Sequence, residues 1–404
     1  IEAAAAPLRR APKLAYRGLQ FSFYEDPELA RRRIDWMAKN GMNYVMYRPS
    51  PDDSDPETVV GLDPRDGRER MPGKPAEVYW PFTKGWFDRV LRPEVRRRGL
   101  KLDMNHHNLC EYWLPPKRYF KEHPEWYALI DGRRGGKFLE LGICTSKREA
   151  VATLIGNIRD FLRDNPEVKT LGVIPQDHCG QWPGMCQCDK CVALDPDPKD
   201  AFRKSDWSTG NRSKSFRYAK LLNEVAAALR GEFPDVSIGG EAYHDLVHPP
   251  RDVEIDPTTT IWFAASMRDG CRPIAAVAGS VVNERIYRWL EEWKKNYRGR
   301  LILYEYYMGL HARASMPYPI SEVICRDWDA LKKLGVAGAT VQCWSSNHSV
   351  YVLNNLVFAR CGWHDDVDHR EVLDDYLLGA YGAAAEDVRP IFAGMLRAVS
   401  ERAA

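Results

Sequence analysis

Short apolar segments alternate with longer amphipathic segments along most of the chain, a pattern typical of alternating β-strands and α-helices. The apolar segments are nearly continuous hydrophobic runs, which indicates strands buried on both faces, as in a parallel sheet. Eight strands are predicted, at residues 14–24, 42–48, 100–105, 170–175, 236–243, 260–265, 301–307 and 337–344. Helices are predicted at residues 27–39, 84–98, 147–163, 215–233, 281–296 and 321–334, whereas Pro-rich residues 245–259 leave little room for one.

The residues that separate these elements agree with the pattern of alternating strands and helices. Gly41, Gly99, Gly299 and Gly335 each follow a predicted helix and precede a strand, where a left-handed C-cap favours glycine. The connections after the second, third and fourth strands are long, at residues 49–83, 106–146 and 176–214. In a (β/α)8 barrel such connections share the face that carries the active site.

The predicted fold class is therefore α/β, a (β/α)8 TIM-type barrel with long strand-to-helix insertions. Residues 1–13 are predicted to form an N-terminal tail, residues 14–349 the catalytic barrel, and residues 350–404 a C-terminal helical extension packed on it.

Three acids lie near the ends of predicted strands. Asp177 follows the fourth strand, Glu241 lies near the end of the fifth, and Glu305 lies in the seventh. A carboxylate at such a position can face the central pocket, where partial desolvation raises its pKa. Loop capping by Asp177 and an outward salt bridge of Glu305 are the alternatives. We expect Glu305 to point inward, because two acids across a pocket are what glycoside hydrolysis needs.

Other polar and aromatic residues near the strand ends are candidate sugar ligands. The 13 Trp and 19 Tyr favour either a large core or rings that stack on sugars. A metal at the adjacent histidines 106 and 107 is disfavoured, because no further ligand lies at a recognised spacing. Candidate substrate-binding residues are Arg48, Asn105, His106, His107, His178, Trp182, Arg268, Tyr307 and Trp344.

A cysteine cluster follows Asp177. Cys179, Cys186, Cys188 and Cys191 place four thiols within 13 residues. They can hold a structural zinc ion or form disulfides, and either would staple the loop beside Asp177. The motifs GxGxxG, GxxxxGK[ST] and HExxH are absent from the sequence, which argues against a Rossmann cofactor, a P-loop and a zincin. We expect no cofactor to be required for catalysis.

Charge and hydropathy limit the partners. The 58 Lys and Arg against 56 Asp and Glu leave a net charge of +2, so the whole chain gives no case for nucleic-acid binding. No apolar stretch approaches the roughly 18 residues of a membrane span. The first residues are too interrupted for a signal peptide and are interpreted as a mature N-terminus or a trimmed start.

Several stretches between residues 100 and 382 resemble a bacterial carbohydrate-degrading barrel family long classified as a domain of unknown function, related to endo-β-N-acetylglucosaminidases acting on complex N-glycans. They are YFKEHPEWYALIDGR at 119–133, LGIC at 141–144, PQD at 175–177, CQCDKC at 186–191, YEYY at 304–307, PYP at 317–319 and VLDDYLLGAYG at 372–382. The chain departs from the family at residues 178–182, where a Gly-rich run is usual, and at Glu305, where Asp is usual. The resemblance implies a secreted or periplasmic protein and makes disulfides more plausible.

These observations predict a glycoside hydrolase for an oligosaccharide or polysaccharide, with a β-N-acetylhexosaminide as the suggested substrate. Asp177 would be the general acid, Glu305 its partner, and Glu241 a substitute for either. If the sugar carries an N-acetyl group, its own carbonyl could be the nucleophile. The alternatives are a non-catalytic carbohydrate-binding barrel and a glycosidase for acidic sugars, such as an α-glucuronidase, with Arg48 or Arg268 holding the carboxylate.

Overall fold

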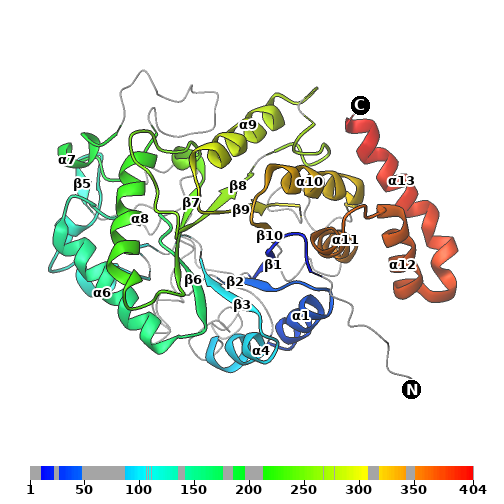
Figure 1. Cartoon of the computed structure of the whole chain (residues 1–404), viewed down its shortest axis with the longest axis horizontal. Helices are drawn as coiled ribbons and strands as arrows, with labels where there is room; N and C mark the ends of the chain where they lie inside the picture. Colours follow the sequence, from blue (N-terminus) through cyan, green and yellow to red (C-terminus); the bar gives the residue numbers. More distant parts are fainter. Residues whose placement is uncertain are drawn as a thin grey trace, which may run out of the picture.

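Eight parallel strands form a closed barrel in the computed structural model (Figure 1). The model describes residues 11–21, 27–47, 87–105, 107, 109–110, 112–134, 142–175, 185–195, 213–266, 268–276, 278–307, 318–342 and 351–403. The barrel strands are β1 (Tyr16–Phe21), β2 (Tyr44–Tyr47), β3 (Lys101–Met104), β6 (Val168–Gly172), β7 (Ser237–Ala242), β8 (Thr260–Ala264), β9 (Arg300–Glu305) and β10 (Gly338–Gln342). Each strand pairs with its neighbours in chain order, and β10 pairs with β1, so the predicted (β/α)8 fold is confirmed.

Helices surround this barrel. They are α1 (Pro27–Lys39), η2 (Phe87–Leu91) with α4 (Arg92–Arg97), α6 (Arg148–Asp164), α8 (Ser215–Arg230), α9 (Val281–Asn296), α10 (Ser321–Leu334) and α11 (Val352–Trp363). The bounds of α1, α9 and α10 are those predicted from the sequence. Between β7 and β8 the chain forms one short 3-10 helix, η6 (His244–Leu246), and no α-helix, as its prolines suggested.

The last helix of the ring is α11, which packs on α10. Trp363 at its end donates from Nε1 to the carbonyl of Gly41, at the end of α1, over 2.6 Å. Thus α11 completes the ring of helices around the barrel. Beyond it, α12 (His369–Tyr381), η8 (Gly382–Ala384) and α13 (Ala385–Ala403) lie at one side of the molecule (Figure 1). None of the described helices has the length and apolar character needed to cross a bilayer.

Smaller elements occupy two of the long connections. Between β3 and α6 lie α5 (Pro116–Tyr119), η3 (Pro124–Trp126) and a hairpin of β4 (Leu129–Ile130) and β5 (Arg133–Arg134). Between β6 and α8 lies α7 (Asp189–Val192).

The glycine prediction is correct at three of its four positions. Gly41, Gly99 and Gly335 have φ of 75°, 62° and 74°, as left-handed helix ends require. The prediction is wrong for Gly299, whose φ is not positive. Close packing is the reason for glycine there, because an added Cβ would lie 2.3 Å from the hydroxyl of Tyr297 and 2.8 Å from the carbonyl of Pro257.

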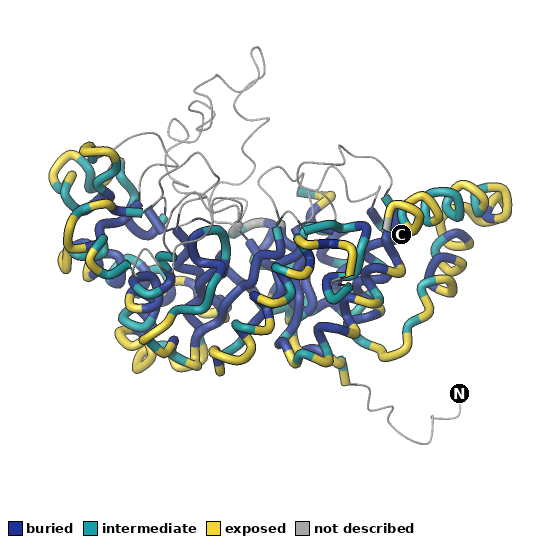
Figure 2. Tube along the Cα trace, turned by 90° about the horizontal axis from the view of Figure 1, so that it is seen from above, coloured by how far each residue is buried: buried dark blue, intermediate teal, exposed yellow. Residues whose placement is uncertain are grey.

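The apolar side chains of the barrel strands belong to two clusters, one that faces into the barrel and one that faces the helices. The inner cluster, which fills the barrel, includes Tyr44, Met46, Trp262, Ile302 and Tyr304. The outer cluster joins the strands to the helices and includes alternating strand residues such as Leu301 and Leu303. Buried residues run through the strands, and exposed ones lie on the outer helices (Figure 2).

Candidate active site at the carboxyl end of the barrel

Glu241 faces the interior of the barrel near the carboxyl end of β7. An added Cβ at Gly239 would meet the indole of Trp262 at 2.0 Å, which shows that residue 239 faces inward, whereas Ile238 and Ala242 belong to the outer cluster. Glu241 shares the face of Gly239 because successive strand residues alternate sides. Its side chain is 7% exposed, so this carboxylate is held close to the top of the filled interior.

The strand that carries Glu241 is fixed by Tyr218 of α8. The backbone N–H of Glu241 donates to the Tyr218 hydroxyl over 3.2 Å, and this hydroxyl donates to the carbonyl of Val173 over 2.8 Å. Burial raises the pKa of Tyr218 well above its ordinary value, so the hydroxyl remains a donor. One tyrosine thus couples β7, the end of β6 and α8, which positions the carboxylate above it.

Two histidines with strained backbones flank Tyr243, two residues beyond Glu241. His107 has φ of 38° and His244 has φ of 46°. Their rings lie 6.1 Å and 3.9 Å from the ring of Tyr243, measured between centroids. His107 donates from Nδ1 to the carbonyl of Pro175 over 2.7 Å, which fixes its tautomer when it is neutral. Left-handed backbone in non-glycine residues is costly and clusters at functional sites.

Asn105 lies on the inner face of the barrel, directly after β3, and its side-chain amide contacts the sulfur of Met46. It is 4% exposed, and an added Cβ at Gly172 would lie 2.6 Å from its Oδ1. On the opposite side of the barrel, the hydroxyl of Tyr304 donates to Oε1 of Gln20. Amide and hydroxyl groups therefore share the inner face of the barrel with Glu241 near its carboxyl end.

A buried polar group that the sequence did not single out lies deeper in the barrel. Asp103 is fully buried and accepts a hydrogen bond from the hydroxyl of Tyr44, which accepts one from Trp262 Nε1 over 3.0 Å. Burial raises the pKa of Asp103 well above its ordinary value, although Tyr44 and Arg300 oppose the rise. Among the described strand residues that face inward, the acids are Asp103 and Glu241, and Glu241 is the one near the mouth.

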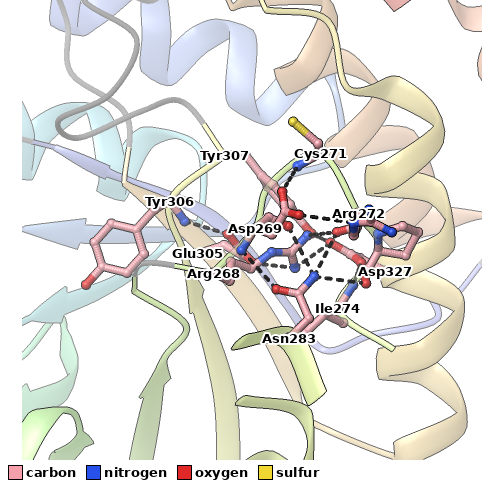
Figure 3. A network of polar contacts seen from close by, with 11 residues as sticks. Arg268, Asp269, Cys271, Arg272, Ile274, Asn283, Glu305, Tyr306, Tyr307 and Asp327 are labelled. Atoms are coloured by element: carbon pink, nitrogen blue, oxygen red, sulfur yellow. Dashed lines mark hydrogen bonds and ion pairs between the residues drawn. The ribbon is translucent and has the colours of Figure 1, made fainter. Parts of the chain in front are cut away.

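Glu305 does not point into the barrel, so this prediction was wrong. It shares the face of Leu301 and Leu303, toward the helices, because the inner positions of β9 are Ile302 and Tyr304. In Figure 3 its carboxylate turns toward Arg268, away from the ring of Tyr306. Arg268 Nη1 lies 2.8 Å from Glu305 Oε1 and 2.8 Å from Oδ2 of Asp327, on the outer helix α10.

The same network engages Arg268 and Tyr307, both predicted to bind substrate. The side chain of Arg268 is 3% exposed, and its Nη2 donates to the carbonyl of Arg272 over 3.0 Å. Tyr307 donates to Asp327 Oδ2 over 2.6 Å. Burial would lower the pKa of Arg268, but the carboxylates of Asp327 and Glu305 outweigh it and raise the pKa. These contacts tie the connection after β8 to β9 and α10, which is a structural task (Figure 3).

The cysteine cluster assembles with a member that the sequence analysis did not group. Cys186, Cys188 and Cys191 lie together with Cys144, and the four sulfurs are within 4.8 Å of one another. Cys144 is 42 residues before Cys186, although its LGIC motif was visible in the sequence. None of the described cysteines forms a disulfide.

The remaining predicted site residues lie outside the described part of the chain. They are Asp177, Arg48, His106, His178, Trp182, Trp344 and Cys179. The predicted juxtaposition of Asp177 with a partner acid therefore stays a prediction.

A family model described as a domain of unknown function, DUF4838, matches residues 18–393. A sequence comparison with curated proteins finds no match. Among solved structures, a β-N-acetylhexosaminidase from Bacteroides fragilis aligns with a TM-score of 0.57 at 11% identity, over 91% of this chain and 71% of that one. Flavobacterium johnsoniae chitobiase aligns with a TM-score of 0.50 at 14% identity, over 93% of this chain and 54% of that one. A mutant Streptomyces plicatus β-hexosaminidase in complex with its product GlcNAc has a TM-score of 0.50 at 14% identity, over 93% and 69%.

Proposed function

Given that the chain belongs to the DUF4838 family, a domain of unknown function, we propose that it is a glycoside hydrolase. The observation that carries the proposal is the inward position of Glu241 at the carboxyl end of the barrel. Two residues further on, the ring of Tyr243 lies near two histidines with strained backbones. Active sites of this fold lie at that end. Its fold, shared with enzymes that act on amino sugars, is consistent with the proposal.

We assign Glu241 the part of the partner carboxylate and Asp177 that of the general acid. Asp177 follows β6 in the sequence, and β6 pairs with β7, which carries Glu241. The acid would protonate the leaving oxygen, and the partner would stabilise the cationic transition state. Glu305 has no part in this scheme, because Arg268 holds it on the side of the helices.

The proposed substrate is a β-N-acetylhexosaminide within an oligosaccharide or polysaccharide. Three structural neighbours are named as hexosaminidases or a chitobiase, which motivates the choice. With such a sugar, the N-acetyl carbonyl would attack the anomeric carbon, and Glu241 would orient or stabilise the N-acetyl group instead of forming a covalent bond itself. The chemistry of this scheme requires no cofactor. Export to the periplasm or beyond is part of the proposal and rests on family resemblance.

An acidic sugar is a weaker candidate. It would need free arginine side chains at the mouth. Arg268 is buried between two carboxylates, so it is not available to a substrate carboxylate, and Arg48 lies outside the described residues.

A panel of p-nitrophenyl glycosides and natural glycans tests the proposal. We expect hydrolysis of the β-N-acetylglucosaminide, and a fall of about 10²–10⁴-fold in the Asp177→Asn protein on natural glycans. The fall should be smaller with p-nitrophenyl leaving groups, which need less protonation. Binding of glycans by the wild-type protein without hydrolysis of any of them would favour the carbohydrate-binding barrel. Hydrolysis of glucuronides alone would favour the acidic-sugar alternative.

A further inference from the structure

We propose that Cys144, Cys186, Cys188 and Cys191 bind one zinc ion as a structural tetrathiolate site that joins two connections at the carboxyl end of the barrel. Cys144 lies in the connection between β3 and α6. The other three lie in the connection between β6 and α8. This inference does not depend on the proposed hydrolase activity.

The distances between the sulfurs fit one metal ion. Cys144 Sγ lies 3.7 Å from Cys188 Sγ and 3.9 Å from Cys191 Sγ. Four sulfurs about 2.3 Å from a tetrahedral zinc ion are about 3.8 Å apart. A disulfide would instead bring two sulfurs to about 2.0 Å. Sulfurs packed this closely leave space for a single ion and none for an iron–sulfur cluster.

Hydrogen-bond donors lie close to the four cysteine sulfurs. Such donors suit metal ligands of the thiolate form, because a thiolate carries a negative charge. The backbone N–H of Leu129 donates to Cys186 Sγ over 3.3 Å. The hydroxyl of Ser146 lies 3.2 Å from Cys144 Sγ and 3.7 Å from Cys188 Sγ, and that of Thr145 lies 3.7 Å from Cys191 Sγ. Such donors around a metal site orient its ligands and stabilise thiolates.

Among the described residues, the apolar core shared by the two connections is small. Their small core consists of Ala128, Cys144, Cys186 and Cys191, with three partly buried neighbours. A core in which most buried members are thiols supplies little hydrophobic stabilisation, and small units of this kind are commonly held by a metal. Zinc would supply the cross-link that the apolar side chains do not.

Hydrogen bonds connect the cysteine cluster to the elements around it, the β4–β5 hairpin and helix α8 of the barrel. Gln187 donates its backbone N–H to the carbonyl of Leu129 over 2.7 Å, which joins the cysteine segment to the β4–β5 hairpin. Arg217 of α8, itself 3% exposed, donates to the carbonyl of Cys186 over 2.7 Å and pairs with Asp195. The zinc site would thus anchor both connections against α8, near the strand ends where Glu241 lies.

The first test measures zinc in the full chain purified without chelators. We expect one zinc ion per chain by elemental mass spectrometry. Protein produced in cobalt medium should show d–d absorption bands at the red end of the visible spectrum. It should also show the near-ultraviolet charge-transfer absorption of a tetrahedral thiolate site. Zinc-free protein with four free thiols, protein with disulfides among these cysteines, or protein that holds iron instead of zinc would overturn the proposal.

Matched variants test the ligand set. Cys144→Ser should lose the zinc, whereas Cys179→Ser, in the same connection as the other three cysteines, should keep it. Cys188→His should also keep it, because imidazole is a zinc ligand. Zinc lost in Cys179→Ser but kept in Cys144→Ser would overturn this ligand set. Since the metal measurements on the wild-type protein need no variant, the proposal remains testable if Cys144→Ser fails to fold.

A structural role has its own readout. Removing zinc with a chelator and a thiol reagent should increase proteolytic cleavage within residues 127–134 and 185–195. Cleavage elsewhere should change little. Unchanged cleavage of these segments after complete zinc removal would contradict the structural role.

Discussion

At the scale of single residues, the direction of a side chain decides its task more than its type does. Glu241 and Glu305 are both buried acids near the carboxyl ends of barrel strands, 7% and 1% exposed. Glu241 faces the interior, on the same face as Gly239 and beside the inward Trp262 of β8. The other faces a helix and neutralises an arginine. Only the first position is compatible with contact to a substrate in the barrel mouth.

Replacing Glu241 by Gln tests this assignment. The amide keeps the shape but removes the negative charge that would stabilise the transition state, so kcat/KM should fall by about 10²–10⁴-fold. The control is Glu254→Gln, an exposed glutamate before β8, toward the amino ends of the strands, which should leave hydrolysis unchanged. Steady-state kinetics on the best substrate of the panel give the comparison. Full activity in the Glu241→Gln protein would remove Glu241 from the mechanism.

Asp103 carries a pH dependence of stability whose sign follows from its burial. Its pKa is raised in the folded state, so between about 3.9, the ordinary value for Asp, and that raised pKa the folded protein binds more protons than the unfolded chain. Stability from this group therefore falls as pH rises through that window. The stability of wild type relative to Asp103→Asn should fall from pH 4 upward in urea unfolding. A difference that is constant with pH would contradict this.

At the scale of elements, close approach inside the barrel fixes where glycine is needed. The missing side chain of Gly239 makes room for the Trp262 indole, which in turn donates to Tyr44. The buried series of hydrogen bonds from Trp262 to Asp103 therefore depends on Gly239, which lies in the neighbouring strand β7.

Gly239→Ala should destabilise the protein by about 1–3 kcal/mol, because the indole has to move in a packed interior. The matched control is Gly231→Ala at the end of α8, where φ is −64° and nothing lies within 4 Å of an added Cβ. That change should be neutral or stabilise by about 0.4–1 kcal/mol. Equal effects of the two substitutions in urea unfolding would refute the packing argument.

The ion-pair network couples β9, α10 and the connection after β8. Arg268→Met would leave Glu305 and Asp327 buried without their cation, and we expect a loss of about 3–5 kcal/mol. Arg272→Met, on the same connection, breaks the more exposed pair with Asp269 and should cost at most about 1 kcal/mol. Urea unfolding compares the two, and a cost for Arg268→Met no larger than that for Arg272→Met would be evidence against the structural role.

At the scale of the whole molecule, burial differs between the closed barrel and the C-terminal helices. The strands of the barrel are paired on both sides and covered by helices. In contrast, α13 packs on α12 through Phe392, whose ring lies 5.7 Å from that of Tyr376, and Ile391 is 56% exposed.

Hydrogen exchange should reflect this difference. Amides of α13 should exchange well before those of β8, because a helix with few buried contacts opens locally at lower free energy than a barrel strand. Mass-spectrometric exchange under native conditions measures both segments in one experiment, with α9 as an internal comparison among helices. Protection of α13 equal to that of β8 would contradict the expectation.

The sequence by itself determined the barrel. Continuous apolar runs, amphipathic helices and glycines such as Gly41 and Gly335 are local signals, and they give the order and bounds of the elements because each depends on nearby residues. They also identified the carboxyl-end connections as the place for acids and thiols. What they could not supply is the inner or outer face of a given strand residue.

Only the tertiary structure decided those matters. Glu305 faces a helix because it follows the inward Tyr304 in β9 and pairs with Val341, which faces outward, and its partner Asp327 comes from α10. Cys144 joins the thiol cluster across 42 residues of chain because two connections meet beside α8. Tyr44 of β2 donates to Asp103 of β3, and Trp262 of β8 donates to Tyr44. Each of these contacts depends on how distant segments pack, and neither spacing nor composition within one segment encodes it.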